Sequence, residues 1–132
     1  MQDKINRIFE ESIRESSSHR VPGQWSPLVD IFEDDMCLVI KVELPGVKRD
    51  DIVLDISNGF LTIKGRKHID HEDNAESFHM IERQHGFFKR SFSLPDGLDL
   101  DRIEAKYSTG VLEILLPKQE GSVSKRIPIT KQ

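Results

Sequence analysis

Two short runs of alternating apolar residues, joined by a tight turn, constrain the fold of this chain most strongly. Residues 103–107 and 111–116 place apolar side chains at every second position, which is the period of a β-strand. Gly110 stands between the runs and can adopt a positive φ without a steric clash, so we expect a hairpin turn there. Pro117 has no amide hydrogen to donate to a sheet and ends the second run. This stretch therefore predicts a β-hairpin with one apolar face.

The same alternation recurs along the middle of the chain, between turn signals. We expect further strands over residues 28–33, 36–44, 52–57, 60–65, 78–84 and 87–94. Asn58-Gly59 is the strongest short hairpin signal in the chain. About eight short strands with no helix between them predict an all-β fold, an immunoglobulin-like antiparallel β-sandwich over residues 27–118.

Residues 1–26 precede the sandwich as an amphipathic arm and linker. Ile5, Ile8, Phe9 and Ile13 recur at helical spacing, but a helix this short is marginal in water unless its apolar face packs against something. The stripe either caps its own domain or binds sister subunits and unfolded client proteins. The polar, linker-like segment that follows favours the second interpretation.

Residues 119–132 form a polar tail that carries an isolated apolar triplet, Ile127, Pro128 and Ile129. Pro128 stiffens the chain, so both isoleucine side chains can point the same way. Burying two isoleucines yields roughly 3–6 kcal/mol before association costs, which corresponds to about millimolar binding or somewhat tighter. For the triplet alone chance composition is an alternative. If it is an anchor, only many tails acting together hold an assembly.

Composition excludes several classes of function. The chain has a net charge of −4 and 32% charged residues, whereas a general nucleic-acid binder carries a basic excess. The longest apolar runs are about five residues, far below the ~20 needed to span a bilayer, and the N-terminus lacks an apolar signal region. Cys37, the single cysteine, reads as a core hydrophobe in a reducing compartment. We therefore expect a cytoplasmic protein that binds neither nucleic acid nor membrane.

Motifs that carry enzymatic chemistry are absent from the sequence. It contains no Gly-x-x-x-x-Gly-Lys, Gly-x-Gly-x-x-Gly, Gly-x-Ser-x-Gly or His-Glu-x-x-His. His68 and His71 lie near His79, His85 and several carboxylates, but two histidines in a polar loop lack a defined ligand geometry, and we interpret them as solvated. We predict no catalytic residue, metal or cofactor. A mild pH response of assembly between about pH 5.5 and 7 would follow if these histidines lay at a dimer contact.

The stretch Ala105-x-x-x-x-Gly-Val-Leu-x-Ile-x-Leu-Pro-Lys118 resembles the signature of the α-crystallin domain of small heat-shock proteins, in the bacterial and plant branch. Further segments match that family in its order. These are Pro27 with Asp30-Ile31, Leu44-Pro45-Gly46-Val47, Leu61-x-Ile63-x-Gly65-x-Lys67, Glu82-Arg83-x-x-Gly86-x-Phe88-x-Arg90 leading to Leu94-Pro95, and Ile127-Pro128-Ile129. An arginine is commoner at the position of Lys67, and the arm is short for the family, which leaves oligomer size open.

This resemblance implies an ATP-independent holding chaperone that assembles from dimers into oligomers, captures non-native client proteins and passes them to ATP-dependent chaperones. Capture would use the arm and grooves freed when tails dissociate. The loop Arg66–Ser77, which includes His68, Ile69 and His71, would carry a short strand that pairs with the neighbouring subunit and covers an exposed sheet edge. One alternative is a small monomeric co-chaperone or adaptor that binds one folded partner, against which the tail and this loop argue. A weaker alternative is an enzyme with a shallow site.

Two further predictions, for Arg90 and for a groove that receives the tail anchor, rest on sequence position together with the family resemblance. Arg90 shares a strand face with Phe88, Phe92 and Leu94, so its guanidinium needs a carboxylate or carbonyl partner unless its head reaches water. In the family the matching arginine supports the dimer, and we predict a charge near that interface. The family docks its tail anchor in a groove between the fourth and eighth strands. Our candidates for this anchor groove are Ile52, Leu54, Phe92 and Leu94.

Overall fold

The computed structural model describes residues 24–69, 77–120 and 128–130 of the chain. Within these residues eight strands form, together with two short 3-10 helices. In chain order they are β1 (Gln24–Trp25), β2 (Val29–Glu33), β3 (Cys37–Glu43), η1 (Arg49–Asp51), β4 (Ile52–Ser57), β5 (Phe60–Lys67), β6 (Gly86–Ser93), η3 (Leu100–Arg102), β7 (Glu104–Ser108) and β8 (Val111–Pro117). No helix among the described residues is long and apolar enough to cross a membrane.

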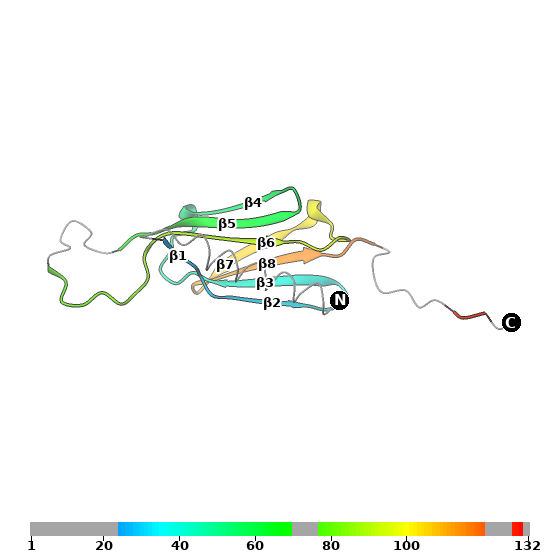
Figure 1. Ribbon diagram of the computed structural model, residues 1–132, viewed down its shortest axis with the longest axis horizontal. Coiled ribbons are helices and arrows are strands. Elements are labelled where there is room, and N and C mark those ends of the chain that lie inside the picture. The colour runs from blue at the N-terminus through cyan, green and yellow to red at the C-terminus, as the bar shows by residue number, and fades with distance from the viewer. Residues whose placement is uncertain (1–23, 70–76, 121–127, 131–132) are drawn as a thin grey trace.

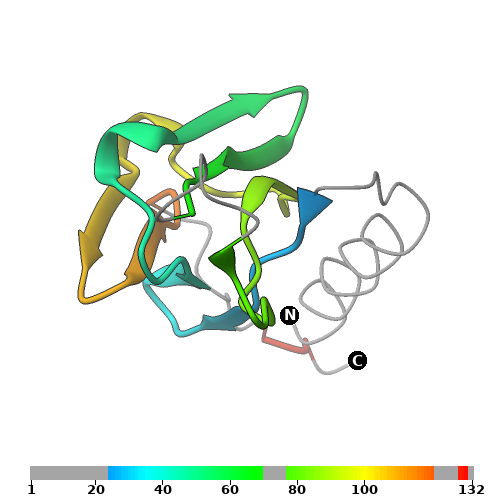
Figure 2. The same ribbon diagram turned by 90° about the vertical axis from the view of Figure 1, so that its left-hand side faces the viewer.

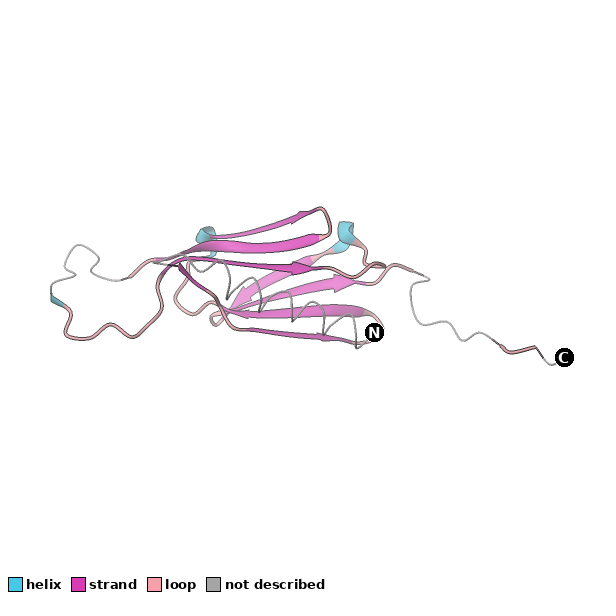
Figure 3. Cartoon of the chain, in the orientation of Figure 1, coloured by secondary structure: helices cyan, strands magenta, loops and turns pink. Residues whose placement is uncertain are grey.

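Two four-stranded sheets pack face to face. One has the order β1-β6-β5-β4 and the other β2-β3-β8-β7, and their strands run along the long axis of the molecule (Figure 1; Figure 3). A view along the strands separates the two layers (Figure 2). Neighbouring strands are antiparallel, except that the short β1 lies parallel to β6. The predicted all-β sandwich is confirmed.

The core lies between the sheets and is built from every second residue of the long strands. On β8, Leu112, Ile114 and Leu116 are buried, while the residues between them are only partly buried. Strands β3, β5 and β6 contribute in the same way. The fully enclosed side chains include Leu38, Ile40, Val42, Leu61, Ile63 and Phe92. A period of two in the sequence therefore becomes one buried face for each strand.

Both predicted hairpins are present. Asn58 and Gly59 connect β4 to β5 with φ angles of 53° and 79°, and Thr109 and Gly110 connect β7 to β8 with 51° and 80°. Two successive positive φ angles define the type I′ turn, whose twist matches that of the flanking strands. In each turn glycine occupies the second of the two positions.

The strand predicted over residues 78–84 is wrong, because this segment is irregular in the structure. Strand β5 runs on through Lys67 and pairs with β6 from Gly86 onward, and the segment between them pairs with none of the edge strands of its own chain. Its apolar side chains consequently stay exposed, Met80 to 72%. The eighth strand of the structure is β1 instead. The sequence does not predict it, because a strand of two residues is too short to show an alternating pattern.

Candidate functional site

An open groove lies between the edges of the two sheets. Strand β4 ends one sheet and β7 ends the other, and the space between them forms a cavity of about 640 Å³. Its apolar lining comes from Ile52 and Leu54 on β4, Ala105 and Tyr107 on β7, and Leu112 on β8. Arg49, Lys106 and Ser108 complete the lining. Because both edge strands end their sheets here, apolar side chains remain accessible that would be covered further inside.

Tyr107 holds one wall of this groove in place. Its hydroxyl, which has one hydrogen to donate, lies 2.5 Å from the carbonyl oxygen of Leu44 and 2.6 Å from that of Val47, two residues that flank the turn between β3 and η1. Burial raises the pKa of Tyr107, and the hydrogen bond to Val47 works against that rise. Tyr107 thus ties the β3–β4 connection to β7. The sequence signal for this contact is one tyrosine at an alternating position of the hairpin.

The structure places only part of the predicted anchor groove at this cavity. Ile52 and Leu54 line it, but Phe92 is 0% exposed in the core. The prediction that Phe92 lines the anchor groove is therefore wrong. Strand β6 has neighbours on both sides, and its inward side chains are covered by the opposite sheet. Leu94 is partly buried against the same core. Residues of β7 form the second wall instead.

Arg90 is buried inside the sandwich, on the same face of β6 as Phe88 and Phe92. Its Nη1 donates to the carbonyl oxygen of Pro27 at 2.7 Å, and its Cζ lies 5.2 Å from the centroid of the Phe92 ring. The expected carbonyl partner is therefore present. Because Pro27 precedes β2, the arginine links β6 of one sheet to the start of an edge strand of the other.

The predicted exchange loop begins later than its assigned first residue. Arg66 still belongs to β5, where its guanidinium lies 5.5 Å from the Phe87 ring centroid. His68 Nε2 lies 3.5 Å from Asp51 Oδ2, an ion pair only when the histidine is protonated. Ile69 lines a second cavity, and Ser77 is exposed. Next to it stand the exposed side chains of Phe78, Met80 and Ile81.

Several predicted residues lie outside the described residues. These are Ile5, Ile8, Phe9 and Ile13 of the arm, His71 of the loop, and Ile127 of the tail. Ile129 is described and is 97% exposed, and the segment that carries it lies well away from the sandwich (Figure 1). In this structure Ile129 does not occupy the groove of its own chain.

Comparison with known proteins settles the family. Residues 30–130 match the model of the Hsp20/alpha crystallin family. The chain belongs to that family. Small heat shock protein C4 of Rickettsia felis is 37% identical over 134 residues, covering 98% of this chain and 82% of that protein.

Solved structures of other small heat-shock proteins share the fold. The protein from Xylella fastidiosa, described as having a distinct high order structure, is 40% identical with a TM-score of 0.71 and covers 82% of this chain and 99% of its own. Heat shock protein 16.0 of Schizosaccharomyces pombe is 32% identical with a TM-score of 0.75, covering 97% of this chain and 93% of its own.

The Hsp20/alpha crystallin family consists of ATP-independent chaperones rather than enzymes. In the part of the chain that the structure describes, no three histidine, cysteine or acidic residues come close enough together to hold a metal ion. Exposed apolar surfaces of the described chain include the β4–β7 groove, the 78–81 segment and Ile129.

Proposed function

We propose that this small heat-shock protein is a holding chaperone, which binds unfolding proteins without ATP and keeps them from aggregating. It works as an oligomer of strand-exchanged dimers whose tails dock on neighbouring subunits. One observation carries the proposal: an open apolar groove and the exposed Ile129 of the predicted anchor occur in the same chain and do not meet. Each buries its apolar surface when the tail of one subunit enters the groove of another.

The start of the tail supports this arrangement. The Lys118 amide donates to the carbonyl of Met36 at 2.8 Å, and the Gln119 amide donates to the carbonyl of Gly97 at 2.7 Å. The Lys118 ammonium also lies 3.4 Å from Glu33 Oε2, with both side chains largely buried. The tail therefore leaves the sandwich from a fixed point, and its anchor reaches neighbouring subunits from a defined origin.

Weak individual tail contacts account for capture of clients. Two isoleucines contribute roughly 3–6 kcal/mol before association costs, so one tail dissociates readily while many together hold the assembly. Dissociation on warming uncovers the groove and the arm, whose apolar residues Ile5, Ile8, Phe9 and Ile13 would bind exposed segments of clients. The released clients would pass to ATP-dependent chaperones.

The decisive experiment combines light scattering of a heat-denatured model enzyme with the absolute mass of the chaperone at several temperatures, both without ATP. We expect an assembly that exchanges subunits faster on warming and suppresses aggregation of the enzyme at stoichiometric amounts. Serum albumin at equal mass concentration is the control for unspecific protection. A protein that stays monomeric at every temperature and leaves aggregation unchanged would rule out the holding mechanism and favour the adaptor alternative.

A further inference from the structure

An apolar row crosses the outer face of the β2-β3-β8-β7 sheet, the face turned away from the other sheet. Phe32 on β2 lies opposite Val39 on β3, and Val39 lies opposite Leu115 on β8. Their neighbours along the strands, such as Leu38 and Ile114, pack in the core, so these three side chains point outward. We call Phe32, Val39 and Leu115 the outer row.

The burial of Val39 exceeds what its place in one sheet explains. It is 4% exposed, yet it lies outside the cluster of side chains that pack between the sheets. Phe32, its neighbour in the outer row, is 47% exposed. Flanking strands screen an outward side chain from the sides but not from above, because side chains stand roughly perpendicular to a sheet. The low exposure of Val39 therefore indicates that a further segment covers this face.

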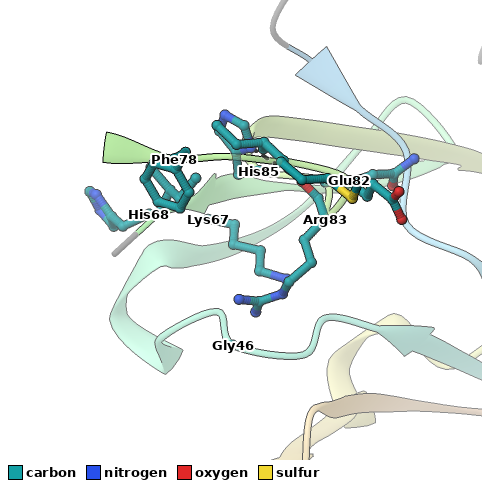
Figure 4. Close-up of a pocket in the computed structure, with 11 residues that line it drawn as sticks. Gly46, Lys67, His68, Phe78, Glu82, Arg83 and His85 are labelled. Atoms are coloured by element: carbon teal, nitrogen blue, oxygen red, sulfur yellow. Dashed lines mark hydrogen bonds between the residues drawn. The ribbon is translucent and has the colours of Figure 1, made fainter. Parts of the chain in front are cut away.

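Two other apolar surfaces of the described chain have occupants in the proposed assembly. The β4–β7 groove would receive the tail. A second cavity, of about 290 Å³, lies beside the end of β5, with Phe78, Met80 and Ile81 in its lining (Figure 4), and a second subunit would engage this segment by strand exchange. The outer row belongs to neither contact. Strand exchange at the edge of β2 uses backbone groups and leaves the side chains on the face of the sheet.

The arm leaves the sandwich beside the outer row. Residues 1–23 lie outside the described residues, and Gln24 begins β1. Because β4 and β7 share the groove, β1 and β2 end their sheets at the opposite edge of the sandwich. Linker residues 16–23 span at most about 28 Å, and a helix over residues 4–15 is about 18 Å long. Strand β3 spans about 23 Å, so the arm reaches this face and matches its length.

We propose that the apolar stripe of the arm, Ile5, Ile8, Phe9 and Ile13, rests on the outer row of its own chain. The inference rests on the proposed holding function and adds the regulation of that function. While the stripe is docked, it is covered and cannot bind clients. Warming releases the arm and exposes the stripe together with the outer row, so one event uncovers two apolar surfaces. Capping its own domain and binding clients are then two states of the same arm.

Cys37 reports on this contact, because it is the only cysteine of the chain and lies two positions from Val39 on the outer face of β3. In the full-length protein a second cysteine replaces Ile5 or Ile13, at the two ends of the stripe. A disulfide requires that the two Cα atoms come within about 7 Å of each other. Oxidised glutathione is the oxidant, and non-reducing electrophoresis separates a disulfide within one chain from one between two chains.

Arg7→Cys and Arg14→Cys are the matched controls, because the period of the helix places both residues opposite the stripe. At room temperature we expect a stripe cysteine to form a disulfide within its own chain about tenfold faster than either control. Phe32→Ser should abolish that difference. Phe60→Ser should leave it unchanged, because Phe60 is similarly exposed, at 45%, on the other sheet. Warming to the temperature at which the protein suppresses aggregation should reduce the difference as well.

Four results would overturn the inference. Equal rates for stripe and control cysteines, in a protein that still suppresses aggregation, would remove the resting site and leave the holding function intact. A disulfide that forms between chains would assign the outer row to the arm of a second copy. A difference that persists in Phe32→Ser would place the arm elsewhere. A difference that does not change on warming would mean that release of the arm does not regulate capture.

Discussion

At the scale of single residues, Arg90 on β6 donates a hydrogen bond to Pro27, which precedes β2 of the other sheet. Replacing it with alanine leaves the buried carbonyl of Pro27 without this donor, so we expect Arg90→Ala to lower the free energy of unfolding by about 2 kcal/mol. We also expect it to weaken assembly more than it alters secondary structure, because Pro27 lies between residues 1–26, the arm, and edge strand β2. Urea denaturation and light scattering measure the two effects, and circular dichroism measures secondary structure.

Lys89→Ala is the matched control for Arg90, because Lys89 is the adjacent exposed cation on β6. Its free energy of unfolding should change by less than about 0.5 kcal/mol. An Arg90→Ala protein with parental mass and parental stability would show that the buried guanidinium supports neither the sandwich nor the assembly.

Asp34, at the turn between β2 and β3, makes a pH-dependent contribution to the stability of the fold. Hydrogen bonds from the amides of Cys37 and Met36, each 2.8 Å from Asp34 Oδ1, lower the pKa of Asp34 from its ordinary value of 3.8. A carboxyl whose pKa is lower in the folded state stabilises the fold above its unfolded pKa and loses that contribution as pH falls through its folded pKa. Asp34 therefore favours the folded state above about pH 4 and stops doing so in stronger acid.

The variant Asp34→Asn keeps an acceptor oxygen but cannot titrate. We expect the stability difference between the parent and Asp34→Asn to be constant from about pH 7 to pH 5 and to shrink below about pH 4. Urea unfolding of both proteins along that range measures the difference. A difference that stays constant down to about pH 2 would mean that the two amide hydrogen bonds do not depend on the charge of Asp34.

At the scale of elements, Gly65 sets how closely η1 and β6 approach β5. A Cβ at Gly65 would lie 2.6 Å from Phe88 Cζ and even closer to the backbone oxygen of Asp51. Since a backbone oxygen cannot rotate away, we expect Gly65→Ala to lower the free energy of unfolding by about 3 kcal/mol or more. Gly59→Ala is the control, because nothing lies within 4 Å of its Cβ and only its φ of +79° is unfavourable. Thermal denaturation should place Gly65→Ala well below Gly59→Ala, and the reverse order would refute the packing argument.

We expect that the exposed segment 78–81, which follows the predicted exchange loop Arg66–Ser77, also takes part in strand exchange with a second subunit. Met80 is exposed in irregular backbone, so Met80→Pro should leave the sandwich of one subunit intact. Proline removes the amide that an exchanged strand donates to the edge of β2, and we therefore expect the dimer to dissociate. Sedimentation equilibrium measures this. Met80→Ala retains the amide and should stay dimeric, and dimeric Met80→Pro would contradict strand exchange through this segment.

At the scale of the whole molecule, the tail and the groove should behave as two halves of one contact. We expect changing both Ile127 and Ile129 to glycine to reduce the assembly to small species, predominantly dimers, because the subunit contact loses most of its apolar area. Leu54→Asn, on the groove wall, should reduce the mass in the same way. Size-exclusion chromatography with light scattering measures both variants.

Leu100→Asn is the matched control, because Leu100 is an exposed leucine outside the groove lining. It should keep the parental mass. If the tail variant kept that mass too, the tail would have no part in assembly. If only Leu54→Asn kept it, the tail would dock elsewhere than the β4–β7 groove.

The sequence by itself determined the features that depend on near neighbours in the chain. Alternation fixes which face of β3, β5 and β8 is buried, and Asn58-Gly59 and Thr109-Gly110 fix two hairpins, because a period and a turn are local properties. Its order of motifs also indicated the family, which the comparison confirmed.

Only the tertiary structure decided which distant residues meet. The groove is formed by the edges of both sheets, and the hydrogen bond of Arg90 joins it to Pro27, 63 positions away in the sequence. The predictions of Phe92 as a groove residue and of residues 78–84 as a strand are wrong for the same reason, because both depend on residues that are distant in the sequence. Whether a side chain lies in the core or at the surface depends on which segments pack against it. Whether an extended segment forms a strand depends in the same way on a neighbouring strand. The tertiary fold determines both neighbours.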